Sequence, residues 1–204
     1  ADVALDEEAN ELACEMYRDQ VKRVIKDPAT AQALMPRDYP MGCKRPVIDT
    51  NYYETFNRDN VTLVDLRQGG IEEITEAGVR TAKGDYTFDV LVYATGFDAM
   101  TGALTKIGIS GLNGLSLRQK WSTGPHNYLG LSINGFPNFF TITGPGSPSV
   151  LTNMMVAIEQ HVEWISDCLQ YMDQQGYHRI QASAEAEAEW VQHVNQVADQ
   201  TLYT

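Results

Sequence analysis

Two adjacent cationic residues, Lys44 and Arg45, stand in a stretch where proline and glycine are dense. Pro40, Gly42 and Pro46 exclude a regular helix there, so the backbone around the two cations is expected to form an ordered loop. The rigid fork of an arginine suits the stabilisation of an anion, and a lysine ammonium suits contact with a phosphate. A Lys-Arg pair on a loop can equally be ordinary solvated surface. The pair is therefore a candidate anion site.

A second candidate is the end of an apolar run, Asp89 to Asp98. Residues 90–94 are almost all apolar, which predicts a strand buried on both faces of a sheet. The run stops at Thr95 and Gly96, where the missing Cβ of glycine lets a ligand or another backbone segment come close. In open α/β sheets cofactors bind at this end of the strands. The pattern favours a nucleotide-binding architecture; the alternative is a core strand that ends in a tight turn.

The third candidate is a glycine loop that joins an apolar strand, predicted at 138–143, to a long helix. Ser149 or Thr152 is expected to cap that helix. The loop is similar to a dinucleotide fingerprint, but Pro145 and Pro148 remove backbone donors that would face a pyrophosphate. What remains is a helix N-terminus, whose unpaired N–H groups favour an anion or an electron-rich ring. A plain structural turn is the alternative.

The elements that would position these candidates follow from periodicity and from proline and glycine. Apolar residues at helical spacing predict a helix at 4–25, and a short helical turn is expected at 29–35. One face of the long helix is expected to carry Met155, Ile158, Val162, Ile165 and Leu169. Further helices are predicted at 52–56 and 185–202, and strands at 61–65, 71–75, 79–82, 86–94 and 127–133.

The composition limits the possible partners. A formal net charge of -12 and a pI near 4.6 argue against nucleic acid and anionic membrane, because no basic stripe offsets the repulsion. No apolar run approaches the roughly 18 residues that a membrane span needs. The 3 cysteines are far apart and form no CxxC motif, so no disulfide framework and no metal site is indicated, and a cytoplasmic location is expected. The expected partner is a small molecule or another protein.

Four segments that follow one another along the chain carry a family resemblance: KRPVIDTNYYETFNRDNV, DVLVYATGFDAMTGAL, GPHNYLGLSINGFPNFFTITGPGSPS and NMMVAIEQHVEWI. Together they resemble the carboxyl-terminal portion of a Baeyer-Villiger monooxygenase, a class B flavoprotein monooxygenase. The phenylacetone monooxygenase branch is the most similar, because GPGSPSVLTNMM looks like its longer active-site loop. The resemblance implies an α/β fold class, with incomplete parts of two Rossmann-like domains, one for FAD and one for NADPH.

The resemblance also implies domain limits. Residues 1–93 would be the end of the NADPH-binding domain, with a helical insertion at about 1–36, and residues 94–204 would be the second segment of the FAD-binding domain. The two GxGxxG motifs and the FxGxxxHxxxW fingerprint of the family are missing from this sequence. We therefore expect a fragment that requires the missing amino-terminal part of the same enzyme and that is inactive alone.

The activity implied by the resemblance is the conversion of a ketone to an ester or lactone with O2, by way of a peroxyflavin. Arg45 matches the catalytic arginine that stabilises the peroxide, and Lys44 matches the residue that faces the 2'-phosphate of NADPH. Thr95 and Gly96 match a motif that links cofactor binding to domain motion. The remaining implied contacts are Asn153 and Met154 for cofactor binding, and Ser149, Val150, Leu151 and Met154 for the substrate pocket.

Two other functions stay open on the sequence. One is a related flavin-containing monooxygenase that oxygenates nitrogen or sulfur instead of inserting oxygen beside a carbonyl. The other is a non-catalytic structural or interaction fragment. The product formed from a ketone and from a thioether distinguishes the first rival, and the sequence encoded before Ala1 distinguishes the second.

Overall fold

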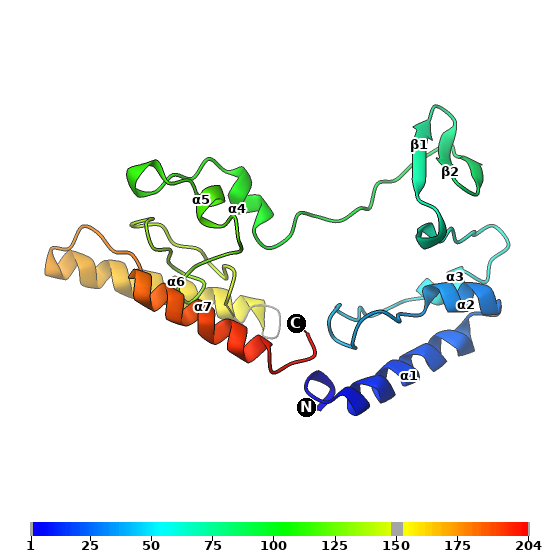
Figure 1. The fold of residues 1–204 in the computed structure, drawn as a ribbon, viewed down its shortest axis with the longest axis horizontal. Coiled ribbons are helices and arrows are strands. Elements are labelled where there is room, and N and C mark those ends of the chain that lie inside the picture. Colours follow the sequence, from blue (N-terminus) through cyan, green and yellow to red (C-terminus); the bar gives the residue numbers. More distant parts are fainter. Residues whose placement is uncertain (1, 148–152, 204) are drawn as a thin grey trace. The chain divides into compact units, whose positions relative to one another are not determined.

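The computed structural model describes residues 2–147 and 153–203, and the chain folds as two compact units (Figure 1). The first unit consists of Ala1–Thr95 together with Asp199–Thr204, and the second unit consists of Gly96–Ala198. The carboxyl-terminal residues thus return to the unit that contains the amino terminus. Each unit has a hydrophobic cluster of its own.

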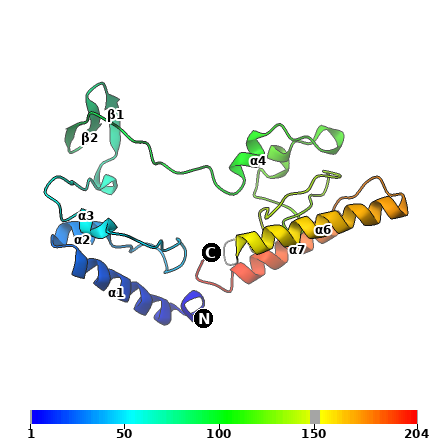
Figure 2. The same ribbon diagram turned by 180° about the vertical axis from the view of Figure 1, so that it is seen from behind.

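The main helices of the first unit begin where short acidic side chains cap them. In α1 (Glu7–Val24), Asp6 accepts a hydrogen bond from Ala9 N at 2.8 Å, and in α2 (Pro28–Leu34), Asp27 accepts one from Thr30 N at 2.8 Å. The two helices lie side by side (Figure 1 and Figure 2). Their shared core is Val21, Ile25, Ala31 and Met35. The helices expected at 4–25, 29–35 and 52–56 are confirmed, the last as α3 (Tyr52–Thr55).

A small antiparallel sheet completes the first unit. Its strands are β1 (Ile71–Thr75), β2 (Gly78–Thr81) and β3 (Gly84–Thr87), in that order. The strands expected at 71–75 and 79–82 are confirmed to within one residue. The strand expected at 61–65 is wrong, since those residues form no strand in the described chain. Short 3-10 turns lie at Asp2–Ala4 (η1) and Leu66–Gln68 (η2).

The expected buried strand at 90–94 is also wrong. Strand β3 stops at Thr87, and residues 90–98 run on without regular structure and exposed to solvent. Val92 is 78% exposed and Phe97 is 100% exposed. A strand that is buried on both faces needs a paired neighbour and covering layers, and the described residues supply neither to this segment. The apolar composition of these residues predicted burial, but the residues are exposed in the described chain.

The second unit is built from helices and irregular loops. Its hydrophobic cluster is Leu117, Trp121, Ile133 and Phe136. Its elements are α4 (Gly102–Lys106), η3 (Leu112–Gly114), α5 (Leu117–Lys120), α6 (Met154–Gln175) and α7 (Ala184–Ala198). The long helix that the sequence predicts is confirmed as α6. The tail helix expected at 185–202 is confirmed as α7, but it ends earlier, at Ala198.

Two strands expected in the second unit are reduced to isolated bridges. Tyr128 pairs with Ser132, and Ser132 pairs with Phe140, so 127–133 and 138–143 form no regular strands. A tight turn interrupts 127–133, because Leu129 and Gly130 both have left-handed backbone angles, with φ of 59° and 70°. In 138–143 the two end residues, Asn138 and Thr143, have left-handed angles, with φ of 57° and 49°.

Helix α6 differs from its prediction at its start and on its face. Its cap is Asn153, and the expected caps Ser149 and Thr152 lie outside the described residues. The buried residues of α6 are His161 and Met172. The face expected to be buried includes Met155, Val162 and Leu169, which are exposed in this unit.

Candidate functional site

The Lys44-Arg45 pair lies directly after a turn in which Cys43 N donates to Pro40 O at 3.2 Å. Both cations are exposed. The Lys44 ammonium lies 4.4 Å from the centre of the Tyr39 ring, a cation-π distance that holds its side chain against the loop. The exposure of both side chains is what a site for an anionic ligand requires.

Thr95 and Gly96 mark the passage from one unit to the other, since the first unit includes Thr95 and the second begins at Gly96. Gly96 has a φ of 85°, and a Cβ built on it would meet no atom within 4 Å. The glycine is therefore needed for its backbone conformation and not for space.

The residues expected at the start of α6 are described only in part. Asn153 Oδ1 accepts a hydrogen bond from Met155 N at 3.1 Å, and Met154 forms the first residue of the helix. Both are exposed. The expected substrate-pocket residues Ser149, Val150 and Leu151 lie outside the described residues. The structure thus brings Asn153 and Met154 together at a helix N-terminus.

The glycine loop that precedes α6 directs its hydrogen bonds inward. Gly144 N donates to Gly130 O at 3.1 Å, and Ser147 N donates to Gly144 O at 3.1 Å. Asn127 Nδ2 donates to the carbonyl of Pro145. A Cβ on Gly144 would lie 2.7 Å from Gly130 O, so the close approach of the two backbone segments requires glycine. The loop has the chemistry of a packed turn, in agreement with the rejection of the dinucleotide fingerprint.

A residue for which the sequence indicated no function holds this loop in place. His161 on α6 is 6% exposed, and its Nδ1 accepts a hydrogen bond from Thr143 N at 3.0 Å. Thr143 has a φ of 49°, a strained angle for a β-branched residue. Burial lowers the pKa of His161, which favours the neutral imidazole that this bond requires. The only signal in the sequence was a histidine near the apolar face of a helix.

We expect the free energy of unfolding of the complete protein to decrease as the pH is lowered and His161 becomes protonated. Because its pKa is lowered from the ordinary 6.5, the unfolded chain binds the proton first. The free energy of unfolding should decrease from about pH 6.5 down to the lowered pKa. His161→Leu should cost about 1 to 3 kcal/mol, because Thr143 N–H loses its acceptor.

Thermal melting of His161→Asn between about pH 8 and pH 5 checks this prediction. The amide oxygen of asparagine provides an acceptor near the position of Nδ1 and does not titrate in this range. The variant should therefore lose less stability on acidification than the wild type. Melting temperatures that fall in parallel for the two proteins would contradict the assignment.

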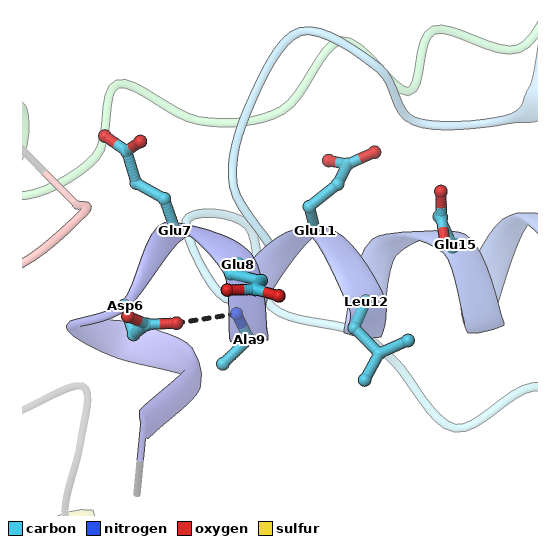
Figure 3. A pocket seen from close by; sticks show the side chains of 7 residues that line it. All are labelled: Asp6, Glu7, Glu8, Ala9, Glu11, Leu12 and Glu15. Carbon is cyan, nitrogen blue, oxygen red and sulfur yellow. Dashed lines mark hydrogen bonds between the residues drawn. The ribbon is translucent and has the colours of Figure 1, made fainter.

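Two cavities lack the positive charge of the Lys44-Arg45 loop and are therefore less suited to a phosphate. The first covers the start of α1 and is lined by Glu7, Glu8, Glu11, Leu12 and Glu15, among others (Figure 3). These carboxylates repel an anion. The second has a volume of about 410 Å³, adjoins Gly146 and Trp190, and has no lysine or arginine in its lining. Neither cavity supplies the positive charge that a phosphate needs.

A metal cluster and a membrane-spanning helix each have requirements that can be compared with the described ranges. Within residues 2–147 and 153–203, no set of three or more His, Cys, Asp and Glu side chains is arranged to hold a metal ion. No helix of that part of the chain combines the length and the apolar character that crossing a bilayer demands.

No family model matches the chain, but curated relatives match almost all of it. It is 41% identical over 201 residues to 2-oxo-Delta(3)-4,5,5-trimethylcyclopentenylacetyl-CoA monooxygenase of Pseudomonas putida. It is 43% identical over 203 residues to cyclohexanone 1,2-monooxygenase of Acinetobacter sp, and 37% identical over 204 residues to phenazine N-monooxygenase PhzNO1 of Lysobacter antibioticus. The matches cover 98 to 100% of this chain and 37% of each relative.

Solved structures give the same result. The chain is similar to OTEMO in complex with FAD and NADP, with a TM-score of 0.96 and 41% identity over 99% of this chain and 38% of that chain. It is similar to oxidized steroid monooxygenase bound to NADP, with a TM-score of 0.93 and 47% identity over 100% of this chain and 39% of that chain. The expected fold class, an incomplete part of such an enzyme, is confirmed. The division into NADPH and FAD domains at 93/94 stays a prediction.

Proposed function

Since this chain is homologous to about 37% of the length of Baeyer-Villiger monooxygenases, we propose that it is part of an FAD- and NADPH-dependent enzyme that converts ketones to esters or lactones with O2. The observation that carries the proposal is 43% identity to a cyclohexanone monooxygenase over 99% of the chain. The proposed partners are a small ketone, O2 and the amino-terminal remainder of the same enzyme. A cytoplasmic location is part of the proposal, and the described cysteines Cys14, Cys43 and Cys168 are free thiols, as expected there.

The exposed cations of the first unit fit the anionic parts of the proposed cofactors. Lys44 would contact the 2'-phosphate of NADPH, and Arg45 would stabilise negative charge that develops on oxygen during the oxidation. The guanidinium suits this role because it stays charged and does not give up its proton. When bound, reduced FAD supplies the electrons that activate O2. Thr95 and Gly96 would link cofactor binding to domain motion, and the positive φ of Gly96 supports a special backbone conformation at this point.

The start of α6 is the proposed binding region in the second unit. Asn153 and Met154 would contact cofactor, and Met154 would also line the substrate pocket together with Ser149, Val150 and Leu151. The exposure of Met154 and its place on a helix N-terminus support this assignment. In the proposal residues 1–93 belong to the NADPH domain and residues 94–204 to the FAD domain.

Lys44→Ala in the complete enzyme should raise the KM for NADPH by about 10- to 100-fold, the worth of a charge-assisted contact with a phosphate. The KM for NADH should change little, because NADH lacks the 2'-phosphate. Steady-state kinetics with both nucleotides measures the difference. Lys26→Ala, which removes an exposed lysine at the end of α1, is the matched control. An equal rise for NADH and NADPH would refute the phosphate contact.

The purified complete enzyme, supplied with NADPH and O2, tests the function itself. A ketone and a thioether are offered in parallel, and the expected product from the ketone is an ester or lactone. The relationship to a phenazine N-monooxygenase favours nitrogen or sulfur oxygenation as the second candidate. Formation of S-oxide with no ester would establish that candidate. Absence of a GxGxxG motif in the residues encoded before Ala1 would instead favour a non-catalytic fragment.

A further inference from the structure

Asn10, on the second turn of α1, is a buried polar residue with an unusual set of partners. Asn10 is 4% exposed. Its Nδ2 donates to Met41 O at 3.0 Å and to Val3 O at 2.6 Å, and its Oδ1 accepts from Met41 N at 2.9 Å. One side-chain amide therefore satisfies both backbone groups of Met41.

This pair of hydrogen bonds fixes the orientation of the peptide groups on both sides of Met41. Two parallel hydrogen bonds define a plane as well as a distance, as the pairing of a β-strand does. Met41 belongs to the turn that Pro40 and Cys43 close, and Lys44 and Arg45 follow this turn directly. Because proline on either side limits the freedom of the loop, the position of Met41 sets where the two cations emerge.

The same turn is held from a second direction by the carboxyl-terminal residues of the first unit. Cys43 Sγ donates to Leu202 O at 3.6 Å, and Leu202 N donates to Ala4 O at 2.9 Å. Gly42 has a φ of 101°, and a Cβ on it would lie 2.7 Å from Cζ of Tyr203. The turn is thus enclosed between α1 and the chain terminus.

We propose that Asn10 is a positioning residue for Arg45, and that it acts by holding the turn at 40–43 against α1. The inference rests on the proposed function, in which Arg45 touches the reacting atoms. A misplacement of such a group by about 1 Å can cost about 100-fold in rate, so a residue remote from the chemistry can have a large effect.

The test compares Asn10→Leu with Asn57→Leu in the complete enzyme. Asn57 is the matched control, because its Oδ1 accepts from Lys26 N and its Nδ2 donates to Val24 O, both at 2.8 Å, far along α1 from the turn. Both variants should lower the melting temperature. Only Asn10→Leu should lower the kcat for ester formation by about 10-fold or more, with the KM for ketone nearly unchanged. Equal losses of ester from the two variants would overturn the proposal.

Combination with Arg45→Ala shows whether Asn10 acts through Arg45. In the Arg45→Ala enzyme, Asn10→Leu should cause no further loss of ester, whereas independent losses that multiply would overturn the proposal. If Asn10→Leu does not fold, Gly42→Ala displaces the same turn from the side of Tyr203 and should give the same selective loss in kcat. Wild-type ester formation by Gly42→Ala, with the turn displaced, would also overturn it.

Amide hydrogen exchange separates a failure of this inference from a failure of the proposed function. Exchange at Met41 should be faster in Asn10→Leu and unchanged in Asn57→Leu. Unchanged exchange in Asn10→Leu overturns the role of Asn10 in holding the turn. Wild-type ester formation by Arg45→Ala, together with faster exchange in Asn10→Leu, overturns the proposed role of Arg45 while Asn10 still holds the turn.

Discussion

Replacement of Arg45 by alanine in the complete enzyme is expected to lower ester formation by about 100- to 1000-fold, the cost of one lost electrostatic contact to a developing anion. Reduction of the flavin by NADPH should proceed at close to the wild-type rate, because that step develops no negative charge on oxygen beside Arg45. Anaerobic stopped-flow absorbance measures the reduction, and gas chromatography measures the ester. The expected signature is an enzyme that consumes NADPH without forming ester.

Two further variants sharpen this result. Arg37→Ala removes another exposed arginine from the same proline-rich loop and should leave ester formation nearly unchanged. Arg45→Lys retains the charge but loses the planar fork, so partial activity would show that charge alone contributes. Ester formation at the wild-type rate by Arg45→Ala would remove Arg45 from the mechanism.

Glu187→Leu is expected to destabilise the protein by about 3 to 5 kcal/mol, the usual cost of removing one partner of a buried ion pair. Glu187 Oε2 lies 2.6 Å from Lys120 Nζ, and the two side chains are 6% and 20% exposed. Glu187 Oε1 also accepts from Asn134 N at 2.9 Å, so one carboxylate joins α7, α5 and the loop at 134. Its loss leaves a largely buried ammonium without a partner. At about 2 to 4 °C per kcal/mol, the melting temperature should fall by about 6 to 20 °C.

The control for this prediction is an exposed ion pair. Asp19 and Lys22 lie 2.9 Å apart on the surface of α1, and Asp19→Leu should leave the melting temperature nearly unchanged because solvent screens this exposed pair. The double variant Lys120→Met with Glu187→Leu should recover part of the loss, because no charge is then left buried. Thermal unfolding followed by circular dichroism compares all three. A melting temperature of Glu187→Leu close to that of Asp19→Leu would contradict the prediction.

The sequence predicted the elements that depend on nearby residues. Helix α1 follows from apolar residues at helical spacing, which lie within the helix itself. The antiparallel strands at 71–75 and 79–82 likewise follow from glycine turns and from strand-forming residues. The family resemblance was also carried by short segments in fixed order. All of these features can be inferred without knowledge of distant contacts.

The burial of a residue and the partners of its side chain depended on contacts between residues that are far apart in the chain. Residues 90–94 have the composition of a core strand, yet they are exposed because nothing in the described chain pairs with them or covers them. The hydrogen bond from Asn10 to Met41 spans 31 positions, and the hydrogen bond from Thr143 to His161 spans 18. A local sequence pattern therefore cannot predict either hydrogen bond. A residue type limits the bonds that a side chain can form, but only the folded chain brings a particular donor to a particular acceptor.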